Sequence, residues 1–225
     1  TGLRSASQRF ISYEIGKSGK VDSVFSISIE SMALMAVVFL ILAETIGLWF
    51  VLNKLNIPSE RMVAAGWVYQ FSIFTFITSM LQSPYYAAII SYEKMDFYAY
   101  VSILDVFLKL VVVYFLQLGN IDKLILYSFL ILAVTIINLV ILIFYTKGKL
   151  KLSFKWLYDK FYFKKILGYS GWTMLNGSSV AAAYQGGNIF LNMFFGVAAN
   201  AAFGVANQVS NAVYGFVGNF QGAFQ

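Results

Sequence analysis

Two residues of opposite charge, Asp105 and Lys109, lie four residues apart inside a long apolar stretch, and they are the strongest candidates for chemistry in this sequence. At this spacing in a helix both side chains lie on one face, where an ion pair offsets part of the cost of leaving water. A purely structural ion pair is the plainer interpretation. In the sharper interpretation this face borders a water-filled cavity, and Lys109 contacts an anionic substrate.

Several classes of chemistry are excluded because the 225 residues include no cysteine and no histidine. Disulfides, thiolate nucleophiles, zinc sites built on Cys and His, and Ser-His-Asp triads all need one of these two residue types. We therefore expect neither an enzyme active site nor a cofactor.

Amides take the place of charges in the last 60 residues, Ile166 to Gln225, which contain no Asp, Glu, Lys or Arg but 10 of the 17 glycines. The amides and glycines recur at steps of three or four, which places them in stripes along helices. Such stripes are typical of tight helix packing, and they could equally form an uncharged wall that hydrogen-bonds sugars or water. The candidates for this wall are Gln185, Asn188, Asn207, Gln208 and Asn211.

The elements that must position these residues are membrane-spanning helices. Hydrophobic residues make up 60% of the chain and charged residues 12%, whereas soluble domains average about 45 to 50% and about 25%. A span needs about 20 mostly apolar residues. Six stretches satisfy this: Val24 to Phe50, Met62 to Ile90, Phe97 to Leu118, Leu124 to Tyr145, Ile166 to Phe195 and Asn200 to Gln225.

Positive charge predicts which side each loop faces. Residues 1–23, 91–97 and 146–165 carry 12 Lys and Arg residues, seven of them in the last segment, whereas the opposite face carries 3. We therefore expect these three segments in the cytoplasm. The net charge of +6 is explained by this orientation and by attraction to anionic lipid, so we expect no nucleic-acid partner.

Three further polar or helix-breaking residues fall within predicted spans. Glu30 and Glu44 lie within about two turns of a span end, where a side chain can reach the interface. Pro84 removes a backbone hydrogen bond and should kink its helix near Met80.

With these residues in view, the chain resembles the polysaccharide-biosynthesis flippases, the lipid-linked oligosaccharide branch of the multidrug/oligosaccharidyl-lipid/polysaccharide exporter superfamily. Tyr86 stands where an Asn is expected after Pro-Tyr, and Asp105 stands where Glu is usual. The similar stretches are Ser7 to Phe10, Trp67 to Phe71, Pro84 to Ile90 with Glu93 to Met95, Asp105 with Lys109, and Gly171-Trp172 followed by two Asn-rich helices.

The resemblance implies an all-α, polytopic bundle that is a fragment of a transporter with two lobes of about six helices each. Residues 1–23 would be the end of an earlier helix and a loop, 24–145 four helices of the first lobe, 146–165 the basic inter-lobe loop, and 166–225 the first two helices of the second lobe. The chain begins at Thr1 without a methionine and ends in an apolar tract, as expected of a fragment.

The function implied is translocation of an undecaprenyl-diphosphate-linked oligosaccharide across the bacterial inner membrane, with Arg4, Arg9 and Lys109 suiting the diphosphate. A cation-coupled multidrug exporter of the same superfamily is the alternative, in which Asp105 would bind Na⁺ or H⁺. A membrane-embedded glycosyltransferase or glycan polymerase would need clustered acids in large extracytoplasmic loops, and the loops here are too short.

Overall fold

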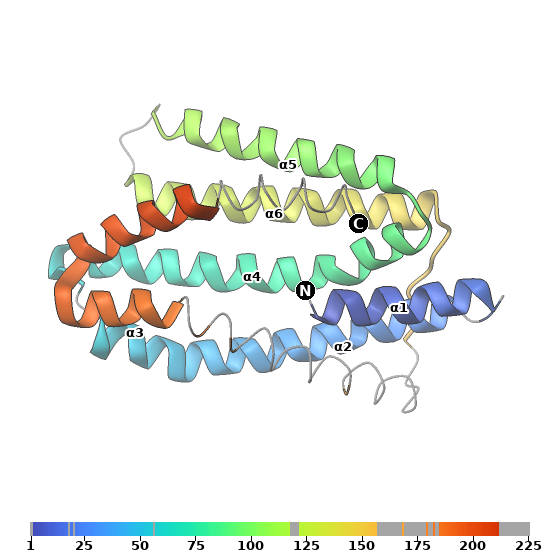
Figure 1. Cartoon of the computed structure of the whole chain (residues 1–225), viewed down its shortest axis with the longest axis horizontal. Helices are drawn as coiled ribbons and strands as arrows, with labels where there is room; N and C mark the ends of the chain where they lie inside the picture. Colours follow the sequence, from blue (N-terminus) through green and yellow to red (C-terminus); the bar gives the residue numbers. More distant parts are fainter. Residues whose placement is uncertain are drawn as a thin grey trace.

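The computed structural model describes residues 2–17, 19, 21–55, 57–117, 122–156, 168, 179, 182 and 185–211. Within these ranges it consists of helices without strands, which confirms the all-α class (Figure 1). The elements are α1 (Gly2–Gly16), α2 (Val21–Leu42), a π-helical turn (Ala43–Gly47), α3 (Leu48–Lys54), a 3-10 turn (Ser59–Arg61), α4 (Met62–Ser91), α5 (Met95–Phe115), α6 (Lys123–Gly148) and a helical segment at Gln185–Asn211.

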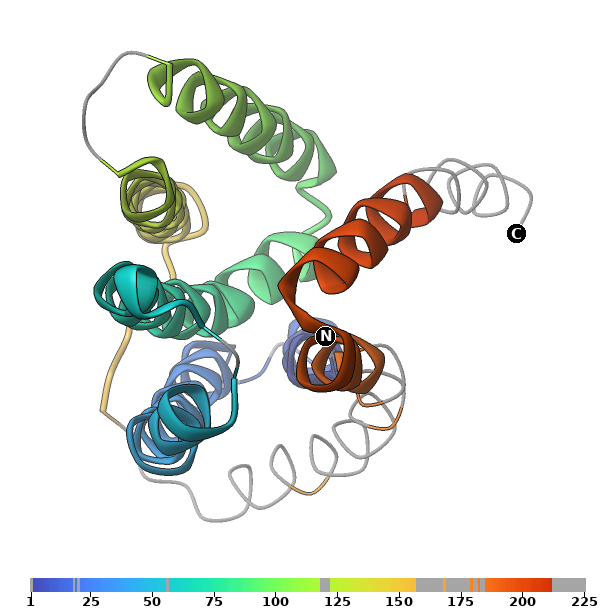
Figure 2. The same ribbon diagram turned by 90° about the vertical axis from the view of Figure 1, so that its left-hand side faces the viewer.

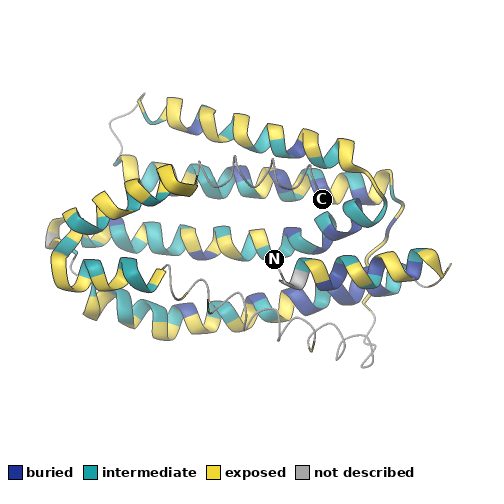
Figure 3. Cartoon of the chain, in the orientation of Figure 1, coloured by how far each residue is buried: buried dark blue, intermediate teal, exposed yellow. Residues whose placement is uncertain are grey.

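By length and composition five of these helical stretches could cross a membrane, and the four before Gln185 do so without a reversal, so the chain is a multi-pass membrane protein. The first four predicted spans correspond to helices whose ends differ from the predictions by at most four residues. Large apolar side chains on the outer helix faces are exposed, for example Ile103 at 67% and Phe144 at 72%, as expected of surfaces that contact lipid (Figure 3).

Helix α4 lies at the centre of the bundle and packs against α1, α2, α5 and α6 (Figures 1 and 2). Ala87 and Ala88 are fully buried where α4 meets α1 and α2, because small side chains allow the helices to approach closely. Pro84 is also buried, and α4 continues through it to Ser91. Figure 1 shows the last turns of α4 bending away from its earlier axis, as the proline predicts.

Buried hydroxyl groups of α2 are satisfied within their own helix. The side chains of Ser28 and Ser31 donate to the carbonyl oxygens of Val24 and Ile27 at 2.8 and 2.7 Å. Such internal bonds remove the cost of a hydroxyl without a partner in an apolar environment. Polar residues of α2 are therefore compatible with a membrane span.

The last helical segment reverses direction at Gly196. Its φ of +82° is left-handed, a conformation that glycine adopts without strain. In a straight helix, Gly187 and Phe203 would be about 24 Å apart, because 16 residues separate them. Here a Cβ added at Gly187 would lie only 4.0 Å from the Phe203 ring, so the two arms of the segment fold back on each other. The break predicted between the last two spans is therefore present (Figure 2). Most of the fifth predicted span, and the sixth beyond Asn211, lie outside the described residues.

An ion pair joins the N-terminal ends of α4 and α6. Arg61 contacts Asp122, which also caps α6 by accepting a hydrogen bond from the Leu124 amide at 2.9 Å. This backbone bond and the Arg61 guanidinium hold the pKa of the Asp122 carboxyl below its usual value. The cap is consequently ionised at neutral pH.

The π-helical turn interrupts the first span where α4 approaches it. Leu48 donates its amide to the Ala43 carbonyl five residues back, and the Tyr69 hydroxyl donates to the same carbonyl at 2.7 Å. The Gln70 amide donates to a carboxylate oxygen of Glu44 at 3.2 Å. Because the helix runs on to Lys54, Glu44 lies farther from the helix end than the two turns that the sequence predicted.

We predict that Gly47→Ala destabilises the protein by about 1 to 3 kcal/mol, because the new methyl group would overlap the Tyr69 hydroxyl oxygen. The Tyr69 ring carbon Cζ lies 3.5 Å from the same position, an ordinary contact. In a Tyr69→Phe background the penalty for Gly47→Ala should therefore largely disappear. A thermal-unfolding double-mutant cycle measures this coupling, and equal penalties in both backgrounds would refute it.

Candidate functional site

One face of α5 carries four polar residues at steps of four, three and four: Tyr98, Ser102, Asp105 and Lys109. This spacing keeps them in one line along the helix. Tyr98 lies about 5 Å from the N-terminal end of α5, and Lys109 lies about 21 Å from it. Since α5 has 21 residues, Asp105 is at its midpoint. The polar line therefore reaches from near the N-terminal end of α5 to beyond its midpoint.

The ion pair predicted from the i, i+4 spacing is present. The Lys109 ammonium donates to Asp105 Oδ2 at 2.6 Å. The side chain of Asp105 is 26% exposed and that of Lys109 is 51% exposed. About half of the Lys109 side chain is therefore exposed, although it lies past the midpoint of α5.

Asn138 of α6 binds the other oxygen of the same carboxylate. Its amide Nδ2 donates to Asp105 Oδ1 at 2.7 Å, and the residue is only 3% exposed. Among the residues that the structure describes, none donates to the Asn138 amide oxygen. Asp105 thus has one partner on its own helix and one on α6, which fixes the carboxylate between them.

Arg4 of α1 enters the same region between two aromatic rings. Its guanidinium lies 4.8 Å from the centre of the Tyr86 ring and 5.3 Å from that of Tyr98. The two rings meet edge to face with centres 5.7 Å apart. Such cation–π contacts are worth about 0.5 to 2 kcal/mol each, the higher value applying away from water. The two tyrosine rings therefore hold the Arg4 guanidinium in place while it keeps its positive charge.

The Tyr86 ring connects α1 with the polar face of α5, because it contacts both the Arg4 guanidinium and the Tyr98 ring. The residues come from α1, α4, α5 and α6 and include two cations and one anion. Their formal charge is therefore +1 inside a membrane bundle. We name this group the polar cluster, and its members are Arg4, Tyr86, Tyr98, Asp105, Lys109 and Asn138.

Arg9 is placed differently. It is exposed, and five residues of helix after Arg4 turn it about 140° away from the face that Arg4 occupies. Arg4 and Arg9 therefore lie on different faces of α1, and the binding role expected of Arg9 stays a prediction.

The predicted amide wall lies on the two arms that meet at Gly196. Asn188 is half-buried and donates to the Gln185 side chain at 3.0 Å, an interaction within one arm. On the other arm Asn207 is half-buried, whereas Gln208 and Asn211 are exposed. The described contacts do not join these amides to the polar cluster, so their sugar-binding role stays a prediction.

Sequence reasoning missed Asn138 and Tyr98. Asn138 is the only amide side chain in α6, and a lone amide in an apolar span is a recognisable sign of an interhelical hydrogen bond. Tyr98 lies two helical turns before Asp105 on the same face, a spacing that was visible in the sequence. Neither of these two patterns in the sequence shows that Arg4 of α1 packs against Tyr98.

No family model, curated protein or solved structure matches the chain. The described residues also contain no group of three or more acidic side chains, cysteines or histidines that could hold a metal ion. The function is therefore inferred from the polar cluster and from the membrane-spanning fold.

Proposed function

We propose that the protein is a flippase that moves a polyprenyl-diphosphate-linked oligosaccharide across the bacterial inner membrane. The observation that carries this proposal is a cluster of net positive charge in which half of the Lys109 side chain is exposed, past the midpoint of α5. Asp105 pairs with one of the two cations, so one positive charge of the cluster is left for an anion to offset during function. The anion of such a lipid is its diphosphate.

The line of polar groups suits movement of this headgroup along the bundle. Arg4 lies at the level of Tyr98, near the end of α5 that is predicted to be cytoplasmic, and Lys109 lies about 16 Å deeper. A diphosphate that enters from that side would meet the guanidinium first and the ammonium second. Successive sites of moderate strength allow passage, whereas one strong site would retain the substrate.

A cation-coupled multidrug exporter is the alternative, because it would use a membrane carboxylate to bind Na⁺ or H⁺. Asp105 suits this role less well, since Lys109 and Asn138 already occupy both of its oxygens. Glu44, whose carboxylate accepts a hydrogen bond from the neutral Gln70 amide, is the better carboxylate for it. Neither function makes or breaks a covalent bond, so we propose a transporter and not an enzyme.

The proposal is tested with the intact protein reconstituted in liposomes that contain a fluorescent polyprenyl-diphosphate oligosaccharide. The fraction of glycan that becomes accessible to an external glycosidase measures translocation. We expect the diphosphate lipid to cross and a neutral glycolipid with the same glycan to remain. Uptake of a cationic dye driven by an ion gradient, without movement of the diphosphate lipid, would instead establish the exporter.

A further inference from the structure

The segment that follows α6, residues 149–156, crosses the N-terminal end of α2 and is attached to it. The Ser153 amide donates to Asp22 Oδ1 at 3.1 Å, and the Lys155 amide donates to the Ser26 hydroxyl at 3.0 Å. Leu152 is 5% exposed and belongs to the apolar core formed by α1, α2 and α4. The backbone of this segment therefore has a defined position.

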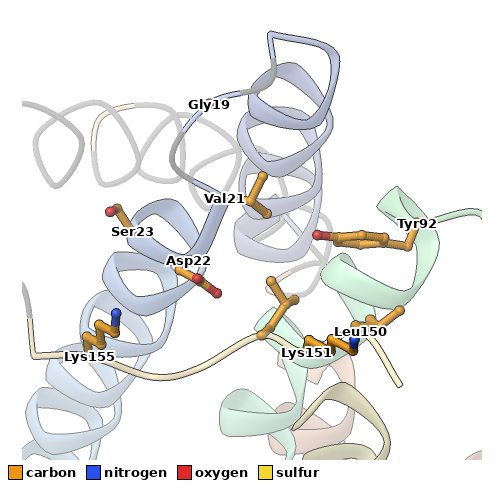
Figure 4. Close-up of a pocket in the computed structure, with 9 residues that line it drawn as sticks. Gly19, Val21, Asp22, Ser23, Tyr92, Leu150, Lys151 and Lys155 are labelled. Atoms are coloured by element: carbon orange, nitrogen blue, oxygen red, sulfur yellow. The ribbon is translucent and has the colours of Figure 1, made fainter. Parts of the chain in front are cut away.

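A cavity of about 460 Å³ lies between this segment, the α1–α2 turn and the end of α4 (Figure 4). Lys151 and Lys155 line it together with Asp22, Ser23 and Tyr92. In Figure 4, Lys155 lies toward Ser23 and Asp22, whereas Lys151 lies beside Leu150. The two lysines thus border the cavity at different points.

Neither ammonium forms an ion pair with a described residue. Lys151 also has a φ of +55°, the left-handed region that few residues other than glycine, Asn and Asp adopt. Asp22 contributes one negative charge, so the lining retains a net positive charge. Burial, and next the Asp22 carboxylate, raise the pKa of the Tyr92 hydroxyl, which is therefore a neutral donor.

The cavity lies where helices leave the bilayer, since α2 begins at Val21, α4 ends at Ser91 and α6 ends at Gly148. Lipid headgroups occupy this level. Val21 and Leu152 add apolar surface to the lining, which suits the part of a lipid next to its phosphate. A basic pocket between helix ends on the cytoplasmic side is a recurrent type of site for anionic lipids.

We propose that this cavity binds the phosphate headgroup of an anionic phospholipid, held by the ammonium groups of Lys151 and Lys155. The inference is independent of the proposed transport function, because it depends on a different surface and on no residue of the polar cluster. Bound lipid would connect the segment 149–156 to the first turn of α2.

The test is a titration of phosphatidylglycerol into the detergent-solubilised intact protein, with bound lipid counted by native mass spectrometry. Lys151→Gln with Lys155→Gln should weaken the tightest phosphatidylglycerol site by about 10- to 30-fold, because each lysine near an anionic lipid contributes about a fivefold gain. Ser23→Phe, which fills the cavity without changing charge, should weaken the same site.

Lys94→Gln with Lys149→Gln is the matched control. It removes the same charge from exposed positions on the same side, outside the cavity lining, and should leave the tightest site nearly unchanged. Equal losses in the two lysine pairs, or wild-type binding by Ser23→Phe, would overturn the proposal. Competition by inorganic phosphate as effective as that by the lipid would do the same, because it would identify a soluble phosphate as the ligand.

Discussion

Lys109→Ala is expected to reduce translocation of the diphosphate-linked oligosaccharide by about 10- to 150-fold, whereas Lys109→Arg should retain part of the activity. The magnitude follows from the loss of one hydrogen bond to a charged group, worth about 1.5 to 3 kcal/mol. Arginine keeps the charge but places it on a longer, planar group. Initial rates in the liposome assay measure the effect, with Lys123→Ala at the start of α6 as a control for loss of a lysine elsewhere.

Loss of Lys109 also removes one of the two groups that bind the Asp105 carboxylate and leaves the Asn138 amide, and this alone would impair the protein. The double variant Asp105→Asn with Lys109→Gln separates the two effects, because it removes both charges together and leaves amides that can bond to each other. If Lys109 contacts the diphosphate, the double variant should be as slow as Lys109→Ala. Wild-type rates in the double variant would show that Lys109 serves only to neutralise Asp105.

The sequence predicted the first four spans and the Asp105–Lys109 pair because both depend on neighbours in the chain. Apolar length determines a span, and four residues of helix bring the two side chains to 2.6 Å. Glu44 shows how a local prediction fails. Its predicted distance from the helix end depended on where the first helix stops, and apolar residues after a π-helical turn extend that helix to Lys54.

The rest of the polar cluster depends on tertiary packing. Arg4 meets Tyr86 and Tyr98 across more than 80 residues of sequence, and Asn138 reaches Asp105 from another helix. These contacts require α1, α4, α5 and α6 to pack in one particular arrangement, for which no periodicity in a single helix gives evidence. The resemblance grouped Arg4 with Arg9 by charge, whereas the helix turns them to different faces.

Arg4→Ala is expected to lower translocation by about 10- to 150-fold, because Arg4 is the cation that a diphosphate entering from the predicted cytoplasmic side would meet first.

Tyr86 and Tyr98 act as positioning residues for the Arg4 guanidinium. Their aromatic rings hold it in place, whereas their hydroxyl groups are not needed for this role. Tyr86→Leu and Tyr98→Leu should each lower the apparent affinity for the lipid by about 2- to 30-fold, the equivalent of one cation–π contact. The corresponding Phe variants should remain close to the wild type.

Rates measured across a range of lipid concentrations distinguish this role from a purely structural one. Displacement of the guanidinium weakens substrate capture, so the Leu variants should raise the half-saturating concentration and leave the maximal rate largely intact. Tyr100→Leu is the matched control, because Tyr100 lies on the same helix and is 71% exposed on another face. If the Phe variants lose as much as the Leu variants, the hydroxyl groups and not the rings carry the effect. In that case the cation–π placement of Arg4 is not what prepares the site for the diphosphate.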